Sequence, residues 1–122
     1  IPYRLWIRGS AEQDMYYNDS MFVQFSDSAD AAGAAHWRIG TSEAFTVVLE
    51  DCDSCGTQGW GWQDNGWNGL GPEIYFARTG TQKIRILRRE DGVSIDQVVL
   101  SAERYLTQAP GLVKNDSTIL SR

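Results

Sequence analysis

The sequence YRLWIRG, residues 3–9, alternates two sets of side chains. Tyr3, Leu5 and Ile7 form one set, and Arg4, Trp6 and Arg8 form the other. Because successive side chains of a β-strand point to opposite faces, a period of two is typical of a strand with one buried face. The segment therefore predicts a half-buried strand.

The same alternation recurs along the chain. Further strand-like runs are SMFVQFS (20–26), AHWRIG (35–40), AFTVVLE (44–50), EIYFA (73–77), QKIRILR (82–88) and VSIDQVVL (93–100). Short turn sequences separate several of these runs, and DSADAAGAA (27–35) is expected to be a loop. Such a series of runs predicts an all-β fold, an antiparallel β-sandwich.

Length and charge limit the class of protein. The 122 residues suit a single domain, and 42% hydrophobic content is ordinary for a globular protein. A net charge of −5 disfavours nucleic acid as a partner, and the cations of KIRILRRE (83–90) are interpreted as a solvated strand face. No run approaches the roughly 18 apolar residues of a membrane span, so no membrane partner is expected.

The character of the chain changes near its C-terminus. Residues 1–106 are predicted to form the sandwich. Residues 107–122, TQAPGLVKNDSTILSR, are predicted to form a separate tail, because Pro110-Gly111 interrupts any regular element. Within the tail, STIL (117–120) suits one short extra or donated strand.

The two cysteines lie close together in DCDSCG, residues 51–56. A closed zinc site needs four nitrogen or sulfur ligands, and His36 is the single histidine available to join them. Glycines follow the pair, so no helix of a redox motif begins there. We therefore predict a Cys52–Cys55 disulfide that shapes a loop, contributes about 2 kcal/mol and indicates an extracellular protein.

Catalytic patterns are weak. His36 lies beside Trp37 in a strand-like run without a nucleophile-elbow motif, which favours a structural role. The carboxylates of Asp64, Glu90 and Asp91 suit glycoside hydrolysis in type, but a chain with 16 acidic residues produces such groupings by chance. The sequence does not predict an enzyme.

Three tryptophans crowd into GWGWQDNGW, residues 59–67. Trp60, Trp62 and Trp67 either plug the end of a core or form an apolar platform for a ligand. The intervening glycines disfavour a continuous packed strand, so we do not expect all three to be core. Indole faces suit the C–H face of a sugar, and the polar side chains expected at the rim are Asp64, Asn65, Glu90 and Asp91.

Asp96 stands out within VSIDQVVL. Strand alternation places it on the same face as Val98 and Leu100, toward the expected interior. A buried carboxylate must be hydrogen-bonded, paired or bound to a metal. The sequence leaves backbone hydrogen bonding and metal binding both open.

Several motifs together resemble a known group of domains. YRLWIRG, NDSMFVQFSDS, GWGWQDNGW, TGTQKIRI and REDGVSIDQVVLS are similar to domains of secreted soil-bacterial proteins related to carbohydrate-binding modules of families 6 and 35. The resemblance covers the chain up to about Leu106. It implies a galactose-binding-like jelly roll that binds a polysaccharide or glycan without catalysis, in a cleft between loops at one end of the sandwich.

The resemblance also assigns roles to residues. Trp60–Trp67 matches one aromatic wall of the cleft, Tyr16 or Tyr17 matches the second, and Glu90 and Asp91 match the polar contacts. Ser94 departs from the Asn of the family's N-I-D pattern, which removes one expected hydrogen bond to sugar. Asp96 matches an acidic residue that helps bind a structural calcium ion.

Members of that group carry further strands before the segment that matches YRLWIRG. The jelly roll is therefore expected to be incomplete at its N-terminus, with an unpaired sheet edge. Another piece of chain, the tail or a strand from a neighbouring copy would fill the gap. The competing function is accordingly that of a structural protein that forms oligomers or filaments by strand exchange, with the Trp-rich loop as an intersubunit contact.

Overall fold

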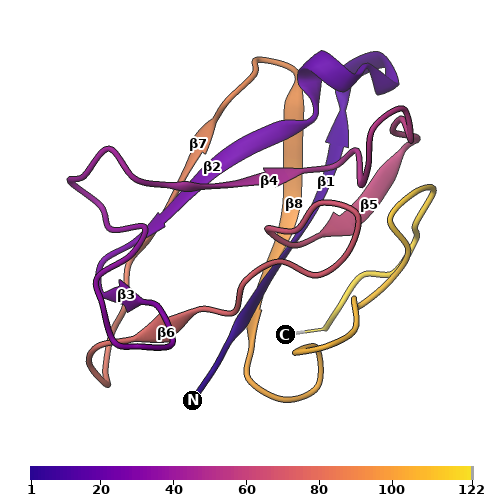
Figure 1. The fold of residues 1–122 in the computed structure, drawn as a ribbon. Coiled ribbons are helices and arrows are strands. Elements are labelled where there is room, and N and C mark those ends of the chain that lie inside the picture. Colours follow the sequence, from indigo (N-terminus) through magenta and orange to yellow (C-terminus); the bar gives the residue numbers. More distant parts are fainter. Residues whose placement is uncertain (122) are drawn as a thin grey trace.

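The computed structural model describes residues 1–121 and shows an all-β protein. Eight strands are joined mostly by loops, and the only helical elements in the described part are two short 3-10 helices. All paired strands run antiparallel, in sheets that face each other as a sandwich (Figure 1). The structure confirms the predicted antiparallel β-sandwich.

Two three-stranded sheets make up the sandwich. The first has the order β5-β1-β8 and the second has the order β4-β2-β7, while β3 and β6 form a small separate ladder. The elements are β1 (Arg4–Ala11), η1 (Glu12–Asp14), η2 (Tyr16–Asn18), β2 (Ser20–Phe25), β3 (Ser28–Ala29), β4 (Phe45–Val48), β5 (Trp60–Gln63), β6 (Tyr75–Phe76), β7 (Ile84–Arg88) and β8 (Val93–Ser101).

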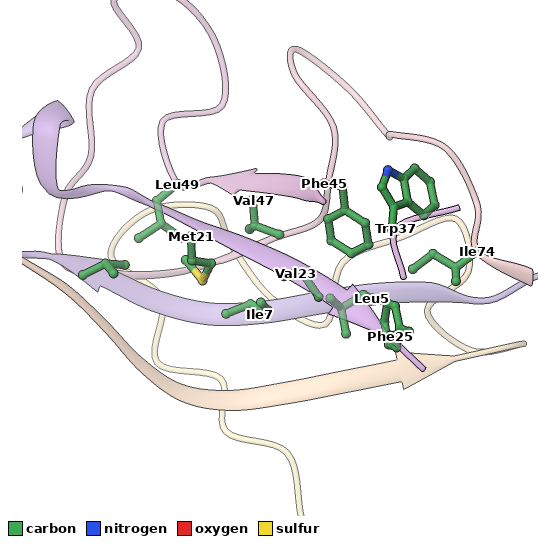
Figure 2. Packing of buried hydrophobic residues seen from close by; sticks show 11 residues of the cluster. Leu5, Ile7, Met21, Val23, Phe25, Trp37, Phe45, Val47, Leu49 and Ile74 are labelled. Carbon is green, nitrogen blue, oxygen red and sulfur yellow. The ribbon is translucent and has the colours of Figure 1, made fainter. Parts of the chain in front are cut away.

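The core lies between the two central strands. Leu5 and Ile7 of β1 face Met21, Val23 and Phe25 of β2, and all five are almost fully buried (Figure 2). Burial of each such side chain is worth about 1.5–3 kcal/mol. These are the alternate apolar positions of two predicted strands, so the period-two pattern identifies the core correctly.

One predicted strand is absent. Residues 35–40 form only isolated bridges, at Ala35 and Arg38. Trp37 has a φ of 51°, which an extended strand does not allow. Its indole instead turns into the core and packs edge-on against Phe45 at 5.0 Å between ring centroids. The apolar character of this run reflects a tryptophan that plugs the core from a loop.

One strand lies where none was predicted. Trp60–Gln63 of the glycine-rich segment is β5, which pairs with β1 and places Gly61 opposite Gly9. The expectation that glycine would prevent a packed strand was wrong because Gly61 is needed for a close approach. The backbone of Val113 passes so near that a Cβ at residue 61 would collide with its carbonyl group.

That contact belongs to the tail, which folds back over the first sheet. The backbone N–H of Trp62 donates to the carbonyl oxygen of Leu112 at 2.9 Å, and that of Asp116 donates to the carbonyl oxygen of Trp60 at 2.8 Å. Residues 107–121 contain no regular strand, so STIL covers the sheet without extending it as a ladder. Because the tail covers the outer face, seven of the eight residues of β1 are buried, so the prediction of a half-buried strand was wrong.

Candidate functional site

Three loops meet at one end of the sandwich (Figure 1). They are residues 12–19, the β4–β5 connection 49–59 and the β7–β8 turn 89–92. The N–H of Glu12 donates to the carbonyl oxygen of Gly92 at 2.8 Å, and the N–H of Gly59 donates to Asp14 Oδ1 at 2.8 Å. The loops therefore support one another at this end.

The β4–β5 connection carries the disulfide. Cys52 and Cys55 are bonded to each other, as predicted. The N–H of Gly56 donates to Glu50 Oε2 at 2.7 Å, and the ammonium group of Lys114 in the tail donates to the carbonyl oxygen of Cys55. Gln63 of β5 also donates to Asp51 Oδ1 at 2.9 Å, so both the first sheet and the tail hold the disulfide loop in place.

Two segments that carry exposed aromatic side chains contact this loop. Tyr16 and Tyr17 are 65% and 49% exposed, and their rings meet edge-on at 5.6 Å. Trp67 is 53% exposed, and the N–H of its neighbour Asn68 donates to the carbonyl oxygen of Asp51 at 2.6 Å. Gly59 of the disulfide loop thus contacts the tyrosine segment, residues 12–19, and Asp51 contacts the Trp67 segment, residues 64–74.

The other two tryptophans of the segment lie elsewhere. Trp62 is 1% exposed, and its indole N–H donates to the carbonyl oxygen of Thr118 at 3.2 Å. Trp60 is half-buried beneath the guanidinium of Arg8, 5.1 Å from the ring centroid. Both indoles lie on the outer face of the first sheet, so the structure does not gather the three tryptophans into one platform. Trp62 is buried beneath the tail and does not belong to the core cluster between the sheets, so it does not plug the end of that core.

Asp64 and Asn65 shape the β5–β6 loop. The Asp64 carboxylate is 2.7 Å from the Arg4 guanidinium, and both side chains are at least 95% buried. Asp64 also accepts the N–H groups of Gly66 and Gly71, each at 2.9 Å. Asn65 donates to the carbonyl oxygen of Pro72 at 3.1 Å. Asp64 therefore lies inside the molecule rather than at the rim of a site.

Glu90 and Asp91 lie beside the tyrosine segment. Glu90 accepts a hydrogen bond from the Ser20 hydroxyl, whereas Asp91 is fully exposed. Gly92 lies against the side chain of Asn18, where a Cβ would collide with the amide group. The turn that carries Glu90 and Asp91 thus contacts the tyrosine segment through Asn18 and Glu12.

Asp19 is a residue of this end that the sequence analysis missed. Only 3% of it is exposed, and burial together with the charges of Glu90 and Glu50 raises its pKa to about 6. The backbone N–H of Glu50 donates to Asp19 Oδ2 at 3.3 Å, and the N–H of Leu49 donates to its carbonyl oxygen at 2.8 Å. Asp19 thereby joins β2 to the disulfide loop. Its one signal in the sequence is its place directly before a buried strand.

Asp96 does not face the interior. The pairing of β1 with β8 shifts between Arg8 and Gly9, and this bulge turns Asp96 to the outer face of the sheet. There it accepts a hydrogen bond of 2.6 Å from Arg8 Nη1. The expectation of an inward carboxylate was wrong because strand alternation breaks at the bulge. Residues 1–121 contain no group of three or more His, Cys, Asp or Glu side chains placed to hold a metal ion, and calcium binding stays a prediction.

No family model, curated protein or solved structure matches this chain. The resemblance to carbohydrate-binding modules therefore stays a prediction from motifs. Within residues 1–121, no helix is long and apolar enough to cross a membrane.

Proposed function

We propose that this protein is a non-catalytic carbohydrate-binding domain that acts outside the cell. Trp67, Tyr16 and Tyr17 are proposed as the side chains that stack on sugar rings. The observation that supports this most is the contrast in exposure among the aromatic residues. Trp6, Trp37 and Trp62 are at most 8% exposed, whereas the proposed stacking residues are 49–65% exposed.

The chemistry of the surrounding surface suits a neutral glycan. An indole or phenol face packs on the apolar C–H face of a pyranose, and carboxylates accept hydrogen bonds from its hydroxyl groups. Asp91 and Glu90 border the tyrosine segment and supply such acceptors. The net charge of −5 opposes a polyanionic ligand. The Cys52–Cys55 disulfide supports a place outside the cell, where disulfides persist.

Calorimetric titration with a panel of soluble oligosaccharides tests the proposal. Sites of this kind bind weakly, with a Kd in the millimolar to micromolar range, or about 4–8 kcal/mol. We expect Trp67→Ala to weaken binding at least tenfold, because the exposed indole supplies most of the apolar contact. Leu70→Ala is the matched control, since Leu70 lies in the same loop and is 49% exposed.

Two results would overturn the proposal. One is an absence of binding to any glycan of the panel at millimolar concentration. The other is unchanged affinity in both Trp67→Ala and a Tyr16→Ala/Tyr17→Ala double variant, with circular dichroism showing that each variant is folded.

A further inference from the structure

One side of the sandwich is open. β7 and β8 are consecutive strands joined by the turn 89–92, but they belong to different sheets (Figure 1). Each strand is the last of its sheet and is paired along one edge only, β8 with β1 and β7 with β2. The two unpaired edges therefore border the same open side.

The core-facing residues along this side are incompletely covered. Val98 and Leu100 of β8 pair with Ile7 and Leu5, which places them on the core face, yet they are 42% and 40% exposed. Ile84 of β7 pairs with Phe25 and is 43% exposed. In a closed sandwich these positions are buried, so the core itself reaches solvent here.

A cavity marks one end of the open side. Its volume is about 480 Å³, and Tyr3, Phe76, Gln82 and Leu100 are among the residues that line it. The tail lies on the outer face of the first sheet, where Asp116 contacts Arg8 and Leu120 exchanges hydrogen bonds with the side chain of Gln97 in β8, and none of the tail residues 107–121 lines this cavity. Unpaired strand edges beside exposed aliphatic side chains are the features that accept an additional strand.

Charge identifies the strand that fits. Lys83 directly precedes β7, and Arg85 is its second residue. Neither forms an ion pair within the described part of the chain. Arg88 and Arg89 add two more cations at the end of the strand. Two β7 strands side by side would oppose cations to cations. β8 instead carries no cation, and its one charged residue is Asp96, whose side chain is 36% exposed and already accepts a hydrogen bond from Arg8. The basic edge of β7 therefore meets no like charge on β8 of a second copy, whereas it would on a second β7.

We propose that two copies of this chain pair through their open sides, with β7 of each copy antiparallel to β8 of the other. A two-fold axis parallel to the strands produces this arrangement, since it places the first sheet of one copy beside the second sheet of its partner. Each pair of three-stranded sheets becomes continuous, and the half-exposed aliphatic residues close one shared core. Because such an interface is isologous, assembly stops at the dimer and no filament forms.

Analytical ultracentrifugation over a range of protein concentrations tests the proposal. We expect the wild type to sediment as a species of twice the 13.7 kDa chain mass. Val98→Lys places a charge in the shared core and is expected to give a monomer. Arg85→Glu places like charges beside the partner's β8 and is expected to weaken dimerisation at least tenfold. Leu112→Lys is the control, because Leu112 is 66% exposed on the tail and is expected to leave the dimer intact.

The outcomes separate clearly. A wild type that remains monomeric up to about millimolar concentration, or that grows beyond a dimer, overturns the proposal. A dimer that persists in both Val98→Lys and Arg85→Glu also overturns it, because the contact must then lie elsewhere. Arg85 is an exposed side chain, so its variant remains informative if Val98→Lys fails to fold.

Discussion

The carbonyl group of Val113 lies directly against the Cα of Gly61, with no space for a side chain between them. Gly61 lies between Trp60 and Trp62 in β5, and both tryptophans form backbone hydrogen bonds to the tail. Gly61 therefore allows the tail to lie on the first sheet, and the tail buries Trp62.

Gly61→Ala is expected to destabilise the fold and to loosen the tail. Overpacking of a close contact typically costs about 1–3 kcal/mol, and here the colliding atoms belong to backbone that cannot rotate away. Chemical denaturation measures the cost, and hydrogen exchange of the Trp62 amide reports the tail. Gly33→Ala is the control, because Gly33 has a φ of 86° but open space around its Cα, so it isolates backbone strain from crowding. Equal destabilisation by the two variants would contradict the interpretation.

The buried pair of Arg4 and Asp64 gives a second prediction. Asp64→Ala leaves the Arg4 guanidinium buried without its carboxylate, and breaking such a pair typically costs about 3–5 kcal/mol. The Gly66 and Gly71 amides lose their acceptor as well, so the β5–β6 loop is expected to become more mobile. Arg78→Ala is the control, since the side chain of Arg78 is 76% exposed in its pair with Asp27 and such a pair contributes about 0–1 kcal/mol. A small, equal effect of both changes would count against a structural role for Asp64.

The core faces of several strands were predictable from the sequence because their apolar residues alternate, although the other face of β1 is buried as well. β1, β2 and β4 follow this rule, and so does the core-facing part of β8 up to its bulge. The bulge opposite Arg8 escaped prediction, because nothing local in VSIDQVVL marks where alternation breaks. Trp37 escaped for a related reason, since an apolar residue that enters the core from a loop looks like part of a strand.

The candidate site was predictable only in part. Tyr16, Tyr17 and Trp67 are exposed on loops, as binding residues of this kind require. Trp62 and Asp64 are buried by contacts with Thr118 and Arg4, each more than 50 positions away in the sequence. Such long-range contacts decide whether an indole or a carboxylate faces solvent, and they cannot be predicted from the neighbouring residues in the sequence.

A third prediction concerns the disulfide. Replacing Cys52 and Cys55 together with serine is expected to cost about 2 kcal/mol, because the bond closes a very short loop. The effect should be confined to residues 50–59, since the bond joins no two distant elements. Hydrogen exchange should therefore show faster exchange in this loop and unchanged protection in β1 and β2. Loss of protection throughout the core would show that the bond holds the fold itself. Ser54→Ala, within the same loop, is the control for a change of side chain alone.

The raised pKa of Asp19 predicts a specific dependence of stability on pH. Burial and the nearby charges of Glu90 and Glu50 raise this pKa from 3.8 to about 6 in the folded protein. Between these values the folded state holds a proton that the unfolded state has released, so the free energy of unfolding falls as pH rises through this window. The stability that Asp19 contributes by holding this proton is complete below pH 3.8 and lost above about pH 6. It amounts to at most about 3 kcal/mol.

Asp19→Asn removes this titration and keeps an oxygen to accept the Glu50 amide. We therefore expect the variant to gain stability relative to the wild type as pH rises from about 4 to about 7, and the difference to level off above that window. Urea denaturation at a series of pH values measures it. Asp91→Asn is the control, since Asp91 is fully exposed, and its profile should run parallel to that of the wild type. If the Asp19→Asn profile also ran parallel to the wild type, the carboxylate of Asp19 would titrate alike in the folded and unfolded states, and the raised pKa would be refuted.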